Sequence, residues 1–312
     1  MEIEFWRRKN VLVTGGAGFL GSYVVSKLQR DLHIPPGSIR IPRSKEFDLR
    51  SLDDCRDVVQ GCDVVFHLAA VTGGIAFSRA YPAQQYHDST LIDLNMIAAA
   101  REAGVDKFVA IGNLFAYATD VPSPIQEKDL FNGLPTDSHR GVGWMKRNLA
   151  LLADLNYRQY GFPMVVVYSA NAYGPRDSLD RQHAHVIPST IMKCLSHNEL
   201  VVWGDGTPTR DFLFAEDVAA GLVLAAERLS PPGYVNIGSG AEISVRELVE
   251  LIVHFTKFAG PVKYDASKGG GDARRCSSVE QARTVLGFQP QYSMRDGIEQ
   301  TVRWYAENFQ AR

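Results

Sequence analysis

The feature that most constrains the fold is a glycine-rich stretch near the start of the chain, "VTGGAGFLG". It stands between an apolar run at residues 10–14 and a helical pattern near residues 18–30. Closely spaced glycines let the backbone turn tightly and approach a phosphate, which then lies at the positive end of the helix. A plain strand–turn–helix is the alternative, but the context favours a dinucleotide site. The residues predicted to contact the dinucleotide here are Gly15, Gly18, Phe19, Leu20 and Gly21.

Apolar, β-branched runs recur along the first half of the chain, each after a helical segment. They lie at residues 38–41, 63–69, 107–112 and 163–169. Runs without polar alternation are typical of parallel strands that are buried on both faces. Their alternation with helices predicts an α/β protein with a Rossmann-type doubly wound parallel sheet. We expect the cofactor-binding domain at residues 1–170, with residues 211–240 returning to it, and a smaller C-terminal substrate-binding lobe at residues 171–210 and 241–312.

The local pattern becomes less regular after about residue 170. We expect a loop at residues 171–177, whose sequence is "NAYGPRD", and a second loop at residues 267–275. Helices are predicted near residues 216–228, 244–257, 279–286 and 294–310. At the other end, the N-terminal residues are expected to run straight into the first strand.

Composition narrows the range of partners and compartments. The formal net charge of −2 gives no electrostatic attraction to nucleic acid or to an anionic membrane. No apolar run approaches the roughly 18 residues that suggest a membrane span. The four cysteines show no CxxC spacing, which favours a reducing compartment and no bound metal. The first residues contain no apolar signal core, so we expect a cytoplasmic protein.

The second apolar run is followed by cations before any acidic residue. The stretch "RIPRSKEFDLR" places Arg40, Arg43 and Lys45 ahead of Glu46. Cations at this point can pair with a ribose 2′-phosphate, which favours NADP, with NAD as the alternative. Solvated surface charges are the other interpretation of the same residues. The residues that follow, Asp48 and Leu49, are expected at the edge of the adenine.

Several longer stretches resemble the extended short-chain dehydrogenase/reductase superfamily and, within it, the GDP-L-fucose synthase family. They are "LAAVTGGIAFSRAYPAQQY", "NAYGPRD", "HVIPS", "VVWGDGTPTRDFLFAEDVA" and "VNIGSG". Members of that family reduce and epimerise a GDP-4-keto-6-deoxymannose with NADPH. The resemblance therefore implies an enzyme, a nucleotide-linked sugar as its partner, and a homodimer.

The resemblance also assigns roles to individual residues. It adds Leu68, Ala69, Ala70, Lys146, Asn171 and Ala172 to the residues expected to bind the cofactor. On the substrate side it implies contacts from His185, Lys193, Trp203 and Arg210. Arginine is suited to bidentate contact with a diphosphate. Core packing is the alternative role for Trp203.

Catalytic positions depart from the pattern of the family. Aligned on it, Asn113 stands where a serine is expected, Phe115 where the epimerising cysteine is expected, and Val142 where the tyrosine that donates a proton is expected. Lys146 and His185 are retained. Valine cannot donate a proton, so the group that protonates the reduced carbonyl oxygen is not evident from the resemblance.

Other residues are candidates for that proton. His139 precedes Val142 by three residues and Lys146 by seven, so the three share a helical face if the helix starts early enough. An exposed His139 at the helix entrance is the alternative, and Tyr117 and Tyr173 are further candidates. Three functions remain open: C4 keto/hydroxyl redox of a GDP-sugar, an epimerisation or dehydration that recycles the cofactor, and cofactor binding without catalysis.

Overall fold

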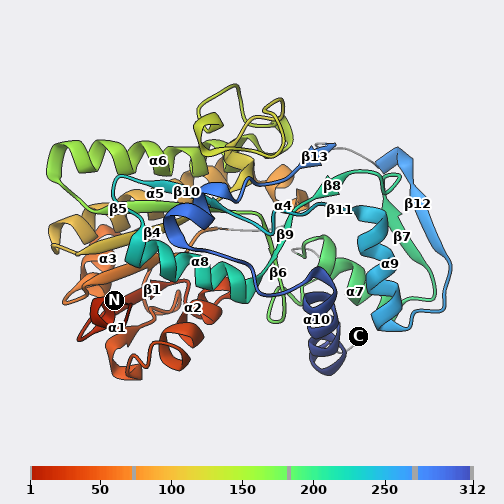
Figure 1. Cartoon of the computed structure of the whole chain (residues 1–312), viewed down its shortest axis with the longest axis horizontal. Coiled ribbons are helices and arrows are strands. Elements are labelled where there is room, and N and C mark those ends of the chain that lie inside the picture. Colours follow the sequence, from red (N-terminus) through yellow and green to blue (C-terminus); the bar gives the residue numbers. More distant parts are fainter. Residues whose placement is uncertain (1, 72–74, 181–183, 269–272, 310–312) are drawn as a thin grey trace.

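The main sheet of the protein is parallel and has six strands. The computed structural model describes residues 2–71, 75–180, 184–268 and 273–309. The strands lie in the order β10-β5-β4-β3-β1-β2 (Figure 1). Their bounds are β1 (Val11–Thr14), β2 (Ile39–Arg40), β3 (Val64–His67), β4 (Lys107–Asn113), β5 (Met164–Ser169) and β10 (Tyr234–Ile237). Every residue of β1, β3 and β5 is buried, which confirms the prediction of a doubly wound sheet covered on both faces.

Helices cover the two faces of this sheet in separate groups (Figure 1). On one face α3 packs on α5 and α5 packs on α6, and on the other face α2 packs on α8. The bounds are α2 (Phe19–Arg30), α3 (Leu52–Val59), α5 (Pro82–Glu102), α6 (Arg140–Tyr160) and α8 (Ala215–Arg228). A shorter helix, α4 (Ile75–Ala80), precedes α5.

The smaller lobe has its own hydrophobic cluster, in which Ile191 of α7, Ile252 of α9 and Ile298 of α10 are fully buried. Its helices are α7 (Val186–Ser196), α9 (Val245–Thr256) and α10 (Met294–Asn308). Its strands form three small sheets: β6 (Asn171–Tyr173) with β9 (Phe212–Phe214), β7 (Leu200–Trp203) with β12 (Val262–Asp265), and β8 (Thr209–Arg210) between β11 (Ile243–Ser244) and β13 (Arg274–Arg275).

Local capping explains where several of these helices begin and end. Ser51, Ser244 and Ser293 each accept a backbone N–H in the first turn of the following helix, and Ser244 forms a reciprocal capping box with Glu247. Gly161 ends α6 in the left-handed conformation, with φ of 68°. Short 3-10 turns lie at Pro36–Ser38, Leu114–Ala116, Glu127–Asp129, Asp137–His139 and Ala266–Lys268.

Three local predictions differ from the structure. The N-terminus does not run straight into a strand, because Glu2–Trp6 form the short helix α1 and Trp6 is buried against the main core. The expected loop at 171–177 begins with β6, whose backbone pairs with β9. The helix expected near 279–286 is a π-helical turn, Ala282–Leu286. Of the second predicted loop, residues 269–272 lie outside the described part of the chain. No helix in that described part has the length and hydropathy needed to span a bilayer.

Candidate functional site

The glycine turn forms a closed backbone cradle at the carboxyl ends of β1 and β3. Gly15 has φ of +68°, and a Cβ on it would lie 3.0 Å from the backbone nitrogen of Ala69. A Cβ on Gly21 would lie 2.2 Å from the carbonyl oxygen of Gly15. The Thr14 hydroxyl oxygen accepts the N–H groups of Leu68 and Ala69 at 3.2 Å each. These contacts leave no room for side chains, so the backbone itself faces whatever occupies the turn.

The helix that follows the turn presents its N-terminus to the same place. Gly18 is the N-cap of α2 in an extended conformation, and no side chain caps the first turn. Phe19 and Leu20, which begin the helix, are half-buried. Uncapped N–H groups at a helix N-terminus favour an anion.

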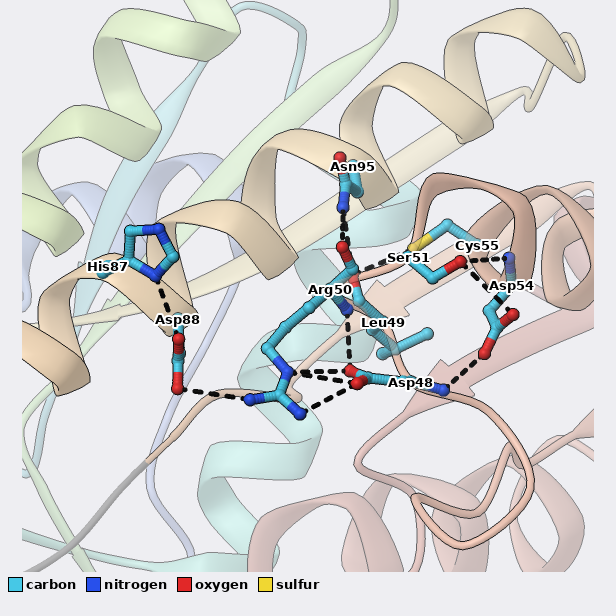
Figure 2. A network of polar contacts seen from close by, with 9 residues as sticks. All are labelled: Asp48, Leu49, Arg50, Ser51, Asp54, Cys55, His87, Asp88 and Asn95. Atoms are coloured by element: carbon cyan, nitrogen blue, oxygen red, sulfur yellow. Dashed lines mark hydrogen bonds and ion pairs between the residues drawn. The ribbon is translucent and has the colours of Figure 1, made fainter.

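The loop after β2 is held by an arginine that bridges two carboxylates (Figure 2). Arg50 donates to Asp48 from Nε at 2.9 Å and from Nη2 at 2.8 Å, and its Nη1 lies 3.4 Å from Asp88 of α5. These hydrogen bonds lower the pKa of the Asp48 carboxyl. Asn95 donates to the carbonyl oxygen of Arg50 at 2.8 Å, and Leu49 is buried. Asp48 is thus exposed, but its carboxylate is already paired with the guanidinium of Arg50.

The two arginines predicted near the ribose have different environments. Nη1 of Arg40 donates to the carbonyl oxygens of Val58 and Gln60, at 2.9 and 2.8 Å, so Arg40 closes the end of α3. Arg43 is exposed, and within the described ranges no hydrogen bond or ion pair involves its guanidinium. Arg43, rather than Arg40, is therefore available to an anionic ligand.

Lys146 lies in α6 with its side chain enclosed. Lys146 is 8% exposed, and its Nζ has no hydrogen-bond partner among the described residues. Burial lowers the pKa of Lys146, while the charge of Asp93 acts in the opposite direction. The Tyr168 hydroxyl donates to the backbone carbonyl of Lys146 at 3.0 Å and links α6 to β5. An ammonium that is largely enclosed in this way fits a ligand that brings its own acceptors.

A chain of polar contacts, formed by Thr14, His67 and Asp93, lies close enough to Lys146 for the charge of Asp93 to act on its pKa. His67 Nε2 is 3.0 Å from Asp93 Oδ1, and His67 Nδ1 is 2.8 Å from the Thr14 hydroxyl. Because the Thr14 oxygen already accepts two backbone N–H groups, its single proton is the one donated to Nδ1. His67 therefore donates from Nε2 to Asp93. Sequence analysis did not single out either residue, because the pairing joins β3 to α5 across 26 positions.

The positions that depart from the family pattern come together around the start of α6. The side chain of Asn113 accepts the backbone N–H of Phe115 at 3.1 Å. The Phe115 ring stacks on His139, with centroids 4.0 Å apart and planes at 6°. His139 and Val142 both line a cavity of about 500 Å³, together with Ser78 and Gln85.

The condition under which His139 would share a helical face with Val142 and Lys146 is not met. The helix α6 begins at Arg140, and His139 belongs to the preceding 3-10 turn, so it does not continue the helical face of Val142 and Lys146. Its ring reaches the same cavity because the turn folds it against Phe115.

His185 faces a buried carboxylate that sequence analysis did not identify. His185 is the N-cap of α7, and its side chain is 60% exposed. Its Nδ1 lies 3.7 Å from Oδ2 of Asp177, which is 6% exposed. The Asp177 carboxylate raises the pKa of His185. Asp177 occurs in a stretch that we expected to be a loop, where a single aspartate gives no periodic signal.

The remaining substrate-side residues lie in the smaller lobe. Trp203 is 57% exposed, which excludes core packing, and Lys268 Nζ lies 5.9 Å above its ring. Lys193 donates to the carbonyl oxygen of Val201 at 3.3 Å, and burial lowers its pKa. Arg210 of β8 is half-buried and donates to the carbonyl oxygen of Thr209 at 2.7 Å.

Asn171 and Ala172 form the start of β6, directly beyond the end of β5. Asn171 donates through its side chain to the carbonyl oxygen of Asp211 at 3.0 Å. That bond reinforces the pairing of β6 with β9, because β9 begins at Phe212, directly after Asp211. Both residues are half-buried at the carboxyl edge of the main sheet.

The two tyrosines considered as proton donors are both enclosed. Tyr117 is fully buried and donates its hydroxyl to Asn236 at 2.7 Å, and burial holds its pKa well above the ordinary value. Tyr173 is buried between Phe212 and Phe214, and its pKa is raised for the same reason. Neither is suited to giving a proton to a ligand. The described residues also contain no group of three or more potential metal-ligating side chains.

The doubly wound sheet, its glycine cradle and the enclosed lysine define a dinucleotide-binding α/β enzyme. A family model with the description "NAD dependent epimerase/dehydratase family" matches residues 11–238. The chain belongs to this family and uses a nicotinamide cofactor.

Known relatives cover nearly the whole chain. It is 32% identical to "GDP-L-fucose synthase 1" of Arabidopsis thaliana, over 96% of this chain and 93% of the relative. Among solved structures, a GDP-L-fucose synthetase from Naegleria fowleri superposes with a TM-score of 0.83 at 25% identity, over 96% of this chain and 93% of that one. A UDP-glucose 4-epimerase from Thermotoga maritima superposes with a TM-score of 0.84 at 25% identity, over 96% and 99%.

Proposed function

We propose that the protein uses NADP(H) to interconvert a keto and a hydroxyl group at C4 of a GDP-linked sugar. Lys146 carries this proposal, because a buried ammonium without a hydrogen-bond partner in the described chain calls for a ligand with acceptors. The ribose of a nicotinamide nucleotide supplies such acceptors. The similarity to proteins named GDP-L-fucose synthase supports the class of substrate.

The cofactor is assigned to the glycine cradle and the loops beside it. The pyrophosphate would lie on the N-terminus of α2, where a side chain at Gly21 would collide with the turn. Arg43 would pair with a 2′-phosphate, which favours NADP over NAD. Leu49, Ala70 and Ala172 are the other residues predicted to contact the cofactor. When bound, the reduced nicotinamide supplies a hydride.

The substrate is assigned to the face between the main sheet and the smaller lobe. Trp203 offers an exposed ring to the guanine, and Arg210 offers a guanidinium to the diphosphate. Lys193, whose pKa is lowered by burial, lies in α7 and reaches β7 at the carbonyl oxygen of Val201. His185 and Asn113 are the residues that would contact the sugar.

Two of the alternatives have a specific observation behind them. The likeness to a UDP-glucose 4-epimerase favours an epimerisation in which the cofactor is recycled. The half-buried Val142 in place of a tyrosine favours a protein that binds the cofactor without catalysis. The match to an epimerase/dehydratase family and the similarity to a GDP-L-fucose synthase favour an enzyme, and we therefore prefer the reductase.

The test is a single-turnover measurement of absorbance at the reduced-nicotinamide band. Enzyme in excess over NADPH receives freshly made GDP-4-keto-6-deoxymannose, and in a parallel sample the corresponding UDP-linked ketosugar. Rapid loss of signal with the GDP-sugar supports the proposal. A flat trace with both sugars, while cofactor fluorescence still reports binding, contradicts it. Lys146→Met serves as the control, in which cofactor binding is expected to weaken.

We further propose that the protein is a homodimer in a reducing cytoplasm. Exposed apolar side chains gather on two adjacent helices, with Tyr86 and Leu94 on α5 and Trp144, Leu151 and Leu155 on α6. The spacing of seven and four residues on α6 places its three on one face. An apolar helix face of this kind favours a protein partner. The four cysteines are all free and buried.

A further inference from the structure

The buried carboxylate of Asp177 is only half satisfied within the protein. Its Oδ1 accepts the backbone N–H of Ser178 at 2.7 Å. Its Oδ2 is buried without a hydrogen-bond partner, and Nδ1 of His185 lies 3.7 Å from it. A buried carboxylate oxygen without a hydrogen bond is costly, so its presence in a native fold calls for an explanation.

The backbone that carries Asp177 is held in an uncommon conformation. Arg176, directly before it, has φ of 69°, which is in the left-handed region and unusual for a side chain of this size. The Tyr23 hydroxyl donates to the carbonyl oxygen of Pro175 at 3.0 Å, and the Tyr305 hydroxyl donates to that of Ser178 at 2.9 Å. Both tyrosines come from distant elements, α2 and α10. Strain that the surrounding structure enforces in this way is typical of functional sites.

We propose that Asp177 is a positioning residue that keeps His185 oriented and protonated, so that His185 supplies the proton for which the chain has no tyrosine. This inference rests on the proposed function. His185, whose side chain is exposed, would be the catalytic residue that contacts the sugar, and the buried Asp177 would act through it.

The chemistry balances with the groups named. Reduction of the sugar ketone adds a hydride, taken from the reduced nicotinamide, to the carbonyl carbon. The π electron pair of the C=O bond moves to the oxygen, and the imidazolium of His185 protonates that oxygen. Nδ1 faces Asp177, so Nε2 is the nitrogen that gives the proton. The side chain of His185 is exposed enough to take up a new proton from water.

Other groups are less suited to this role. Val142 has no proton to give, and the hydroxyl of Tyr117 is committed to Asn236. The His139 ring is stacked on Phe115, with the two ring planes at 6°. Asp177 is the one charged group in the described chain that perturbs the pKa of His185. The carboxylate raises that pKa, so the imidazolium persists to higher pH than in its absence.

The pairing is tested first without substrate. The His185 ring is followed by NMR as a function of pH in the wild type and in Asp177→Asn, with His185→Gln to assign the signal. Asp177→Asn retains an acceptor for Ser178 but removes the charge. We expect the titration midpoint of His185 to move to lower pH. The matched control is Tyr305→Phe, which loosens the same loop without removing charge and should leave the midpoint in place. An unchanged midpoint in Asp177→Asn overturns the pairing, whatever the protein catalyses.

The role in catalysis is tested by the pH profile of NADPH oxidation. Because the acid form of His185 is required, kcat/KM falls as pH rises through the pKa of His185. In Asp177→Asn this fall should occur at lower pH than in the wild type, and His185→Gln should lose roughly 100-fold or more of kcat/KM. Tyr305→Phe should keep the wild-type profile. An Asp177→Asn profile that falls at the wild-type pH overturns the proposal. Absence of NADPH oxidation in the wild type instead refutes the proposed function.

Discussion

Replacing Gly21 with alanine tests whether the glycine turn holds the cofactor. The added Cβ would lie 2.2 Å from the carbonyl oxygen of Gly15 and 2.6 Å from Cα of Gly16. The first distance is more than 1 Å short of ordinary contact, which begins at 3.4 Å. Both neighbours are backbone atoms, so no side chain can rotate away. The glycine turn must therefore move away from α2, and the backbone N–H groups of the turn would move with it.

The size of the effect follows from the cost of overpacking. Forcing an extra methyl group into a closely packed site costs about 1–3 kcal/mol. If this strain is relieved by displacing the turn, the affinity for NADPH falls by roughly 5- to 150-fold. If the strain remains in the fold, the melting temperature falls by about 1.5–5 °C. The loss of binding free energy and the loss of folding stability should together equal the cost of the steric clash at Gly21.

The assay combines a fluorescence titration with NADPH and a thermal melt. Gly37→Ala is the matched control, because a Cβ on Gly37 would meet nothing within 4 Å. It should leave both the affinity and the melting temperature unchanged. If Gly21→Ala matches the wild type in both NADPH affinity and melting temperature, the reasoning from the glycine turn to the cofactor is wrong.

Further predictions concern charge, cofactor choice, assembly and the missing tyrosine. Burial lowers the pKa of Lys107 from 10.5 to about 8, so between these pH values the unfolded chain binds the proton that the folded protein has lost. The free energy of unfolding should therefore rise as pH increases from about 8 to 10.5, and urea titrations of Lys107→Met should lack this rise. Arg43→Ala should weaken NADPH binding about tenfold while NADH binding, measured by the same titration, stays constant. Leu155→Asp should convert dimers to monomers in light scattering, and a dimeric variant would place the interface elsewhere. Adding Val142→Tyr to His185→Gln should raise the rate of reduction at least tenfold over His185→Gln alone, since the new phenol stands one turn before the lysine. Stopped-flow traces of the double variant that stay as slow as those of His185→Gln would contradict this.

The fold was largely predictable because its signals are local. Buried parallel strands and the glycine turn leave contiguous patterns, and β1, β3, β4 and β5 lie within one or two residues of their predicted positions. The helix α1 escaped prediction because its position depends on a tertiary contact, the burial of Trp6.

The candidate site was less predictable because its geometry depends on tertiary contacts. The resemblance pointed to Lys146 and His185, but nothing in the sequence linked His185 to Asp177, eight positions earlier in an apparent loop. Asp93 and His67 were missed for the same reason. The condition under which His139 would share a helical face with Val142 and Lys146 is not met, because a 3-10 turn stands where the first turn of that helix would be. Residues that meet only in the folded chain carry no periodic signal.

The position of β10 in the main sheet bears on how the protein is made. β10 covers the outer edge of β5 but follows it by 65 residues, from Ser169 to Tyr234. While the ribosome synthesises the smaller lobe, β5 is an open edge rich in valine, and open strands of this kind associate readily with other chains. A fragment that stops before residue 234 should therefore aggregate. A split version of the protein should keep residues 234–237 with the first five strands.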